Sequence, residues 1–190
     1  MKTVSIHPHL HDVFGKAQPP IYLLAIVLFG LTVAVAFALS VWPVLAAVSF
    51  WRAALAVLLV LDIAAGCVAN FTPSTNDFYA ARPRNRSVFI AIHVHVVAVA
   101  WLLGSGLGPA IVVWAYTISA ATAVNLLAGR AAQTFVAGVL LSLGLAFLPL
   151  IPGLTPPMAA VAGLFMLKVL FSFAVDHYRA GSPSPSKNGG

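Results

Sequence analysis

Six long runs of apolar residues, separated by short polar or proline-rich links, dominate the pattern of the chain. A helix needs about 20 consecutive apolar residues to cross the hydrocarbon core of a bilayer. A transmembrane β-barrel would instead show segments of roughly ten residues with alternating polarity. The continuous runs therefore predict an all-α integral membrane bundle of about six transmembrane helices. The predicted spans are residues 21–42, 52–69, 88–104, 110–128, 134–151 and 158–175.

These spans divide the chain into three parts. Residues 1–20 form a histidine-containing N-terminal segment, and residues 21–178 form the transmembrane domain. Residues 179–190 are a low-complexity tail that we expect to be flexible. Within the transmembrane domain, residues 70–87 are predicted as a long polar loop between the second and third spans.

The composition excludes several classes of protein. The chain has 190 residues, of which 61% are hydrophobic and only 7% are charged, whereas a soluble domain is about 45–50% apolar and about 25% charged. A soluble enzyme, a disordered tail and a nucleic-acid-binding domain are therefore excluded. Membrane lipids are the expected partners, and assembly into a homo-oligomer or a larger membrane complex stays open.

The basic residues predict the orientation of the bundle. Eight of the ten lysines and arginines fall on the side that holds both termini, namely Lys2, Lys16, Arg82, Arg84, Arg86, Arg130, Arg179 and Lys187. The positive-inside rule then predicts that the N- and C-termini are cytoplasmic. The net charge of +6 is read as an orientation signal. We expect a multi-pass protein of the membrane, which in a bacterium is the cytoplasmic or inner membrane.

Two ionisable side chains, Asp62 and Lys168, lie inside predicted spans, where a charge costs roughly 2.5–3.5 kcal/mol on insertion scales. Each is about eight residues from the cytoplasmic end of its helix, or roughly 12 Å deep at a rise of about 1.5 Å per residue. Equal depth predicts an ion pair. Such a pair either fixes the packing of the helices or relays protons or ions.

His93 and His95 form a second polar group, within the third span. Residues two apart on a regular helix point about 200° away from each other, so both ligate one metal only if the helix is irregular there. His95 shares a face with Ala91 and Ala98, which predicts that His95 points inward. The simplest role for each histidine is a hydrogen bond to a neighbouring helix. The alternatives are a metal ligand, a haem ligand or a general base.

The remaining histidines leave the question of a cofactor open. The N-terminal stretch SIHPHLHD contains His7, His9 and His11, which would point to one side of an extended strand and could share a metal. His177 is a further candidate metal ligand beside His93 and His95. The chain has no HExxH, Walker or GxSxG motif. The cofactor is therefore unknown, with a metal ion or haem as the alternatives.

The loop 70–87, NFTPSTNDFYAARPRNRS, is rich in hydroxyl, amide and guanidinium groups. In one interpretation it is solvated and its arginines bind lipid phosphates. In the other it folds over the mouth of the bundle and binds a phosphate or carboxylate head group. The candidate head-group residues, which include one from the end of the fourth span, are Asn70, Asn76, Tyr79, Arg82, Arg84, Arg86 and Asn125.

Polar residues are concentrated in the predicted cytoplasmic half, which favours a cavity open to the cytoplasm. The first hypothesis is a cytoplasm-facing site that binds or acts on a lipid-soluble or anionic small molecule, with His95, His93 and Asp62 as the catalytic candidates. The second is a small proton- or ion-coupled transporter that uses Asp62 and Lys168. The third is a non-catalytic subunit or assembly factor of a larger membrane complex. Whether the chain is an enzyme is not decided by the sequence.

Overall fold

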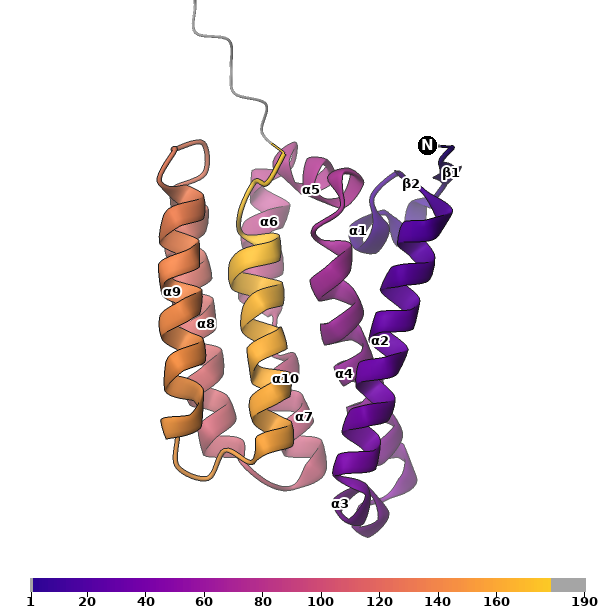
Figure 1. Cartoon of the computed structure of the whole chain (residues 1–190), viewed down its shortest axis with the longest axis vertical. Coiled ribbons are helices and arrows are strands. Elements are labelled where there is room, and N and C mark those ends of the chain that lie inside the picture. Colours follow the sequence, from indigo (N-terminus) through magenta and orange to yellow (C-terminus); the bar gives the residue numbers. More distant parts are fainter. Residues whose placement is uncertain (1, 179–190) are drawn as a thin grey trace, which may run out of the picture.

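The computed structural model describes residues 2–178, which form a bundle of apolar helices (Figure 1). Within these residues, six helical spans are long and apolar enough to cross a membrane. The predicted all-α, six-helix membrane fold is therefore confirmed, while the tail 179–190 lies outside the described residues. The spans are α2 (Pro20–Ser40), α4 (Phe50–Ala69), α6 (Pro83–Ile92) with α7 (His95–Leu103), α8 (Leu107–Leu126), α9 (Gln133–Phe147) with a 3-10 turn (Leu148–Leu150), and α10 (Pro156–Met166) with a π-helical continuation (Leu167–Phe173).

Prolines and glycines set the ends of the helices. Pro20 and Pro156 begin α2 and α10, at positions where the missing N–H group costs no hydrogen bond. Gly104 and Gly106, with φ angles of 70° and 68°, form the tight turn between α7 and α8. Only glycine adopts such left-handed angles without a steric penalty, so this turn depends on both residues.

The helices lie side by side, with α2 at one edge of the bundle and α9 at the other (Figure 1). α10 packs against α4, α7, α8 and α9, and its Phe165 is fully buried. α2 packs mainly on α4, and a Cβ at its Gly30 would lie only 2.9 Å from the Cβ of Ala65. Such close approach at a small residue is how helices associate in lipid.

The segment predicted as the loop 70–87 is largely helical. It contains α5 (Pro73–Ala80) and the beginning of α6. The third span therefore begins five residues earlier than predicted. Thr72 caps α5 because its side chain accepts a hydrogen bond from the Thr75 N–H. Pro73 and Pro83 each occupy the first turn of a helix, so both prolines begin helices within the segment predicted as a loop.

The N-terminal cap, which we define as residues 2–18, folds back against α4 and α5 at the end of the bundle that we call the N-terminal end (top of Figure 1). Its strands β1 (Val4–Ser5) and β2 (Ala17–Gln18) pair antiparallel, with α1 (His11–Phe14) between them. The predicted extended histidine strand is wrong, because a 3-10 turn (Pro8–Leu10) interrupts the tract.

Among the described residues, three hydrogen bonds that involve side chains attach the cap, and in one of them the Ala17 N–H donates to Ser74 Oγ at 3.2 Å. The Gln18 amide is fully buried and donates to Thr72 Oγ1 at 2.5 Å. The Tyr79 hydroxyl donates to the backbone oxygen of Asp12 at 2.9 Å. Burial raises the pKa of Tyr79 well above its ordinary value, so this hydroxyl stays a neutral donor.

Candidate functional site

Asp62 is the centre of a group of titratable side chains from three spans. Lys168 Nζ donates to Asp62 Oδ2 at 2.7 Å and to the Asp62 backbone oxygen at 3.2 Å. His95 Nδ1 lies 3.2 Å from the same Oδ2. We call Asp62, His93, His95 and Lys168 the Asp62 cluster. The ion pair that equal depths predicted is thus present, and a histidine joins it.

Lys168 reaches Asp62 across the backbone of α4 at Gly66, four residues after Asp62. A Cβ at Gly66 would lie 2.6 Å from Lys168 Cε and 2.9 Å from its Nζ, so only glycine leaves room for the side chain. Lys168 belongs to the π-helical stretch, in which the Ser172 hydroxyl donates to the Lys168 carbonyl at 2.9 Å. π-helical turns inside α-helices occur frequently at functional sites.

The third span is interrupted beside Asp62. α6 ends at Ile92 and α7 begins at His95, while His93 has a ψ of 89° and leaves the helical conformation. The expectation that the two histidines point to opposite sides is therefore wrong. Because the helix breaks between them, the rings of His93 and His95 lie edge to face with centroids 4.9 Å apart.

The two histidines differ in burial and in their partners. His93 is buried, its ring packs on Phe89 at 3.9 Å between centroids, and its Nδ1 lies 2.7 Å from the Phe89 carbonyl. A carbonyl only accepts, so this contact assigns the proton of His93 to Nδ1. His95, which was predicted to be the inward one, is the more exposed residue. Its Nδ1 approaches Asp62 but makes no aligned hydrogen bond.

Exposure distinguishes the members of the cluster. The side chain of Lys168 is 3% exposed, whereas those of His95 and Asp62 are 28% and 46% exposed. The protein therefore covers the cation and leaves the side chain of the acid partly exposed. At membrane depth an ionised group in this position requires a ligand, water or a partner.

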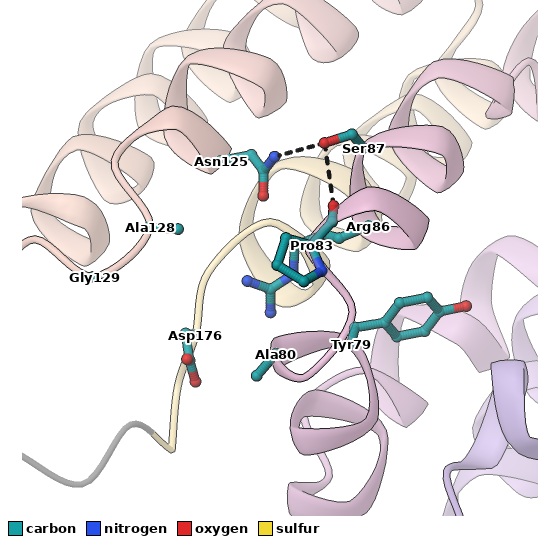
Figure 2. A pocket seen from close by; sticks show the side chains of 9 residues that line it. All are labelled: Tyr79, Ala80, Pro83, Arg86, Ser87, Asn125, Ala128, Gly129 and Asp176. Carbon is teal, nitrogen blue, oxygen red and sulfur yellow. Dashed lines mark hydrogen bonds between the residues drawn. The ribbon is translucent and has the colours of Figure 1, made fainter.

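A second polar site lies at the N-terminal end of the bundle (Figure 2). It is a pocket of about 390 Å³ between α5, the start of α6, the end of α8 and the segment after α10. The Asn125 amide donates to Ser87 Oγ at 3.2 Å on one wall. The lining residues are Tyr79, Ala80, Pro83, Arg86, Ser87, Asn125, Ala128, Gly129 and Asp176.

Only three of the seven candidate head-group residues line this pocket, namely Tyr79, Arg86 and Asn125. Asn70 is buried elsewhere and has no partner for its Nδ2 among the described residues. Asn76 does not line the pocket, but it donates to Oδ1 of the lining residue Asp176 at 3.2 Å.

The other two arginines also lie away from the pocket. Arg82 donates to the Phe78 carbonyl and lies 4.0 Å above the Phe78 ring, and Arg84 is exposed. The seven residues therefore do not form one head-group site.

His177 does not join the other histidines. Its Nε2 lies 3.0 Å from the Phe171 carbonyl, and its ring packs against Phe71. Burial lowers its pKa, which favours the neutral imidazole. Within residues 2–178, no group of three or more His, Cys, Asp or Glu side chains is arranged to hold a metal ion. The described structure therefore does not bring His93, His95 and His177 together, because the third residue lies beyond the end of α10 and contacts Phe171 and Phe71.

Three residues that build these sites are not among the predicted site residues. Gly66 makes room for Lys168, and its position one helical turn after Asp62 is a signal that could have been used. Asp176 forms a wall of the pocket. Gln133 holds the segment after α10, because it donates to the Ala174 carbonyl at 3.0 Å and accepts from the Asp176 N–H at 3.3 Å. Nothing in the sequence marks Gln133, since its partners are distant in the chain.

No protein-family model, curated protein or solved structure matches this chain. The function must therefore be argued from the geometry of the two sites.

Proposed function

We propose that this multi-pass membrane protein binds a small molecule at the Asp62 cluster, within the cytoplasmic half of the bilayer, and exchanges a proton with it. The observation that carries the proposal is the 46% exposure of the Asp62 side chain, whose carboxylate contacts both Lys168 and His95. Lys168 itself is covered, so the accessible side of the pair is the acid.

The three side chains have complementary roles in this proposal. Lys168 donates to Asp62 and holds negative charge on its carboxylate. His95 accepts or gives the proton, because its imidazole is partly exposed and lies 3.2 Å from the Asp62 carboxylate. Asp62 balances the positive charge on His95 when the imidazole is protonated.

A groove supports access from the N-terminal end. The groove has a volume of about 460 Å³ and runs between the N-terminal cap and α6 as far as Phe89 and Ile92. Phe89 packs directly on His93. A lipid-soluble or anionic molecule that follows this groove therefore reaches Phe89, whose ring packs on His93 of the cluster. The basic residues of this end favour the cytoplasmic side.

Labelling with dicyclohexylcarbodiimide tests whether Asp62 is open to a small molecule. This apolar reagent enters membranes and attaches to accessible protonated carboxyl groups, and the chain contains only four acidic residues. We expect modification of Asp62, identified by peptide mass spectrometry, and more of it in Lys168→Met, because the counter-charge is lost. Exposed Asp77 provides the control site. Absence of label at Asp62 in both proteins would show that the carboxylate is covered and would contradict the proposal.

Proton-coupled transport is a second candidate, and the interruption of the third span favours it. Discontinuous helices with charged groups near them form the substrate and ion sites of many transporters. The break at His93 lies beside the ion pair of Asp62 and Lys168. Proteoliposomes that contain a pH dye would test this function, with fractionated soluble metabolites added as candidate substrates and the internal pH as the measured quantity. We expect a pH change with the native chain that Asp62→Asn abolishes and Asp77→Asn retains; equal signals from all three would exclude coupling through Asp62.

A further inference from the structure

Arg86 is a buried cation whose Nε has no hydrogen-bond partner among residues 2–178. It lies in the first turns of α6 and is 4% exposed. The ion pairs found in the described part of the chain both involve Asp62, so Arg86 takes part in neither. A buried charge without a partner is costly, because the lost hydration is not replaced. The carboxylate of Asp176 lines the same pocket and attracts this charge, but the two form no ion pair among residues 2–178. The guanidinium therefore keeps donor groups for a molecule that enters the pocket.

The guanidinium of Arg86 points into the pocket at the N-terminal end, as Figure 2 shows. Its planar set of N–H donors matches the oxygens of a phosphate or carboxylate in two parallel hydrogen bonds. The pocket of about 390 Å³ has room for a small molecule beside it. Asn125, whose amide nitrogen donates to Ser87, contributes further polar atoms to the same wall.

Asp176 gives the pocket a charge of the opposite sign. Its Oδ1 accepts from Asn76 at 3.2 Å, and its backbone N–H donates to Gln133, so its position is held from two sides. A simple anion in the pocket would be repelled by Asp176, and a simple cation would be repelled by Arg86. A molecule that carries both charges can place its negative group beside Arg86 and its positive group beside Asp176.

We infer that the pocket binds a compact zwitterion, in which an oxyanion is joined to a primary ammonium by a short linker. The oxyanion lies against Arg86 and the ammonium against Asp176. Phosphoethanolamine has this chemistry, both as a free molecule and as the head group of a phospholipid. The inference concerns a site separate from the Asp62 cluster and holds whether or not Asp62 exchanges protons.

Calorimetric titration of the full chain in detergent with O-phosphoethanolamine tests the inference. We expect saturable binding, and an affinity at least about tenfold lower in both Arg86→Gln and Asp176→Asn, since each removes one charged contact. Inorganic phosphate and ethanolamine, which each carry half of the zwitterion, should bind more weakly than the whole molecule. Arg84→Gln and Asp77→Asn alter exposed charges nearby and should bind like the native chain.

Nanodiscs distinguish the two sources of the zwitterion. Weaker binding of O-phosphoethanolamine in phosphatidylethanolamine discs than in phosphatidylcholine discs would identify the lipid head group, through competition. Equal binding in both would identify a free molecule. Thermal unfolding of each variant checks that it folds, and Arg86→Lys replaces Arg86→Gln if that variant does not. No binding to the native chain in detergent or in phosphatidylcholine discs would overturn the inference, as would native affinity in both Arg86→Gln and Asp176→Asn.

Discussion

Lys168 and Arg86 are both buried cations on spanning helices, but only Lys168 forms an ion pair among the described residues. Lys168 contacts a carboxylate of the same chain at 2.7 Å, and the exposed partner is the acid. Arg86 has no such pair, and its pocket opens at the N-terminal end. The comparison teaches that burial alone does not indicate the role of a charge. In the Asp62 cluster the buried cation has its counter-charge within the chain, whereas Arg86 forms no ion pair and lines an open pocket.

The largest expected effect comes from breaking the completed pair. Asp62→Asn leaves Lys168 buried without a counter-charge, which should lower the free energy of unfolding by about 3–5 kcal/mol. The double variant Asp62→Asn/Lys168→Met removes both charges and should recover much of this loss. Unfolding in mixed micelles measures both proteins. If the single and double variants were equally unstable, the charge pair would not be the cause.

Gly66→Ala should disturb the same pair without removing a charge. The new Cβ would overlap Lys168 Cε at 2.6 Å, and we expect a loss of about 1–3 kcal/mol from overpacking. Gly138→Ala on α9 is the matched control, because a Cβ there meets no atom within 4 Å and alanine favours the helix by up to about 1 kcal/mol. The comparison uses the same unfolding measurement. Equal effects of the two substitutions would show that Lys168 does not need the space at Gly66.

Arg86→Met should behave in the opposite way from Asp62→Asn. In the absence of a ligand it removes an unpartnered buried charge, so the free energy of unfolding should be unchanged or rise by about 1 kcal/mol. Added O-phosphoethanolamine should stabilise the native chain and have no effect on the variant. A large destabilisation of ligand-free Arg86→Met would mean that Arg86 already has a structural partner and would remove the contrast with Lys168.

The smallest expected effect concerns pH. Burial lowers the pKa of His177, so the unfolded chain binds its proton at a higher pH than the folded chain does. Neutral His177 contributes fully to the free energy of unfolding above the pKa of histidine in the unfolded chain, which is about 6.5. This contribution is lost as the pH falls towards the lower pKa of His177 in the folded chain. The drop in unfolding temperature between pH 7.5 and 5.5 should therefore be slightly smaller in His177→Gln. Exposed His9 provides the control substitution, and an identical drop in His177→Gln and His9→Gln would contradict this account.

The sequence predicted those features that depend on one helix at a time. Apolar runs located the six spans, and the depths of Asp62 and Lys168 were enough to predict that they meet. The break after Ile92 was not predictable, because neither glycine nor proline marks it. Its geometry depends on tertiary packing, in which Phe89 stacks between His93 and Phe173 at centroid distances of 3.9 and 3.8 Å.

The pocket of Arg86 was beyond sequence reasoning for a similar reason. Arg82, Arg84 and Arg86 look alike in the chain, and only the packing of α6 against α8 buries the third. Asp176 and Gln133, which shape the opposite wall, are far from Arg86 in sequence. The helical character of α5 was missed because Pro73 and Pro83 restrain a loop and begin a helix with the same fixed φ angle.

The N-terminal cap also bears on how the chain is made. Gln18 and Asp12 leave the ribosome early, but their partners Thr72 and Tyr79 follow only after α2 and α4 have been synthesised. The cap can therefore dock only when an even number of membrane crossings separates it from α5, with both segments on the same side. A chain in which one of the first two helices failed to insert would lack these hydrogen bonds and leave the Gln18 amide without its partner. All the residues of these two contacts precede the last four spans in the chain, so the contacts require correct insertion of α2 and α4 only.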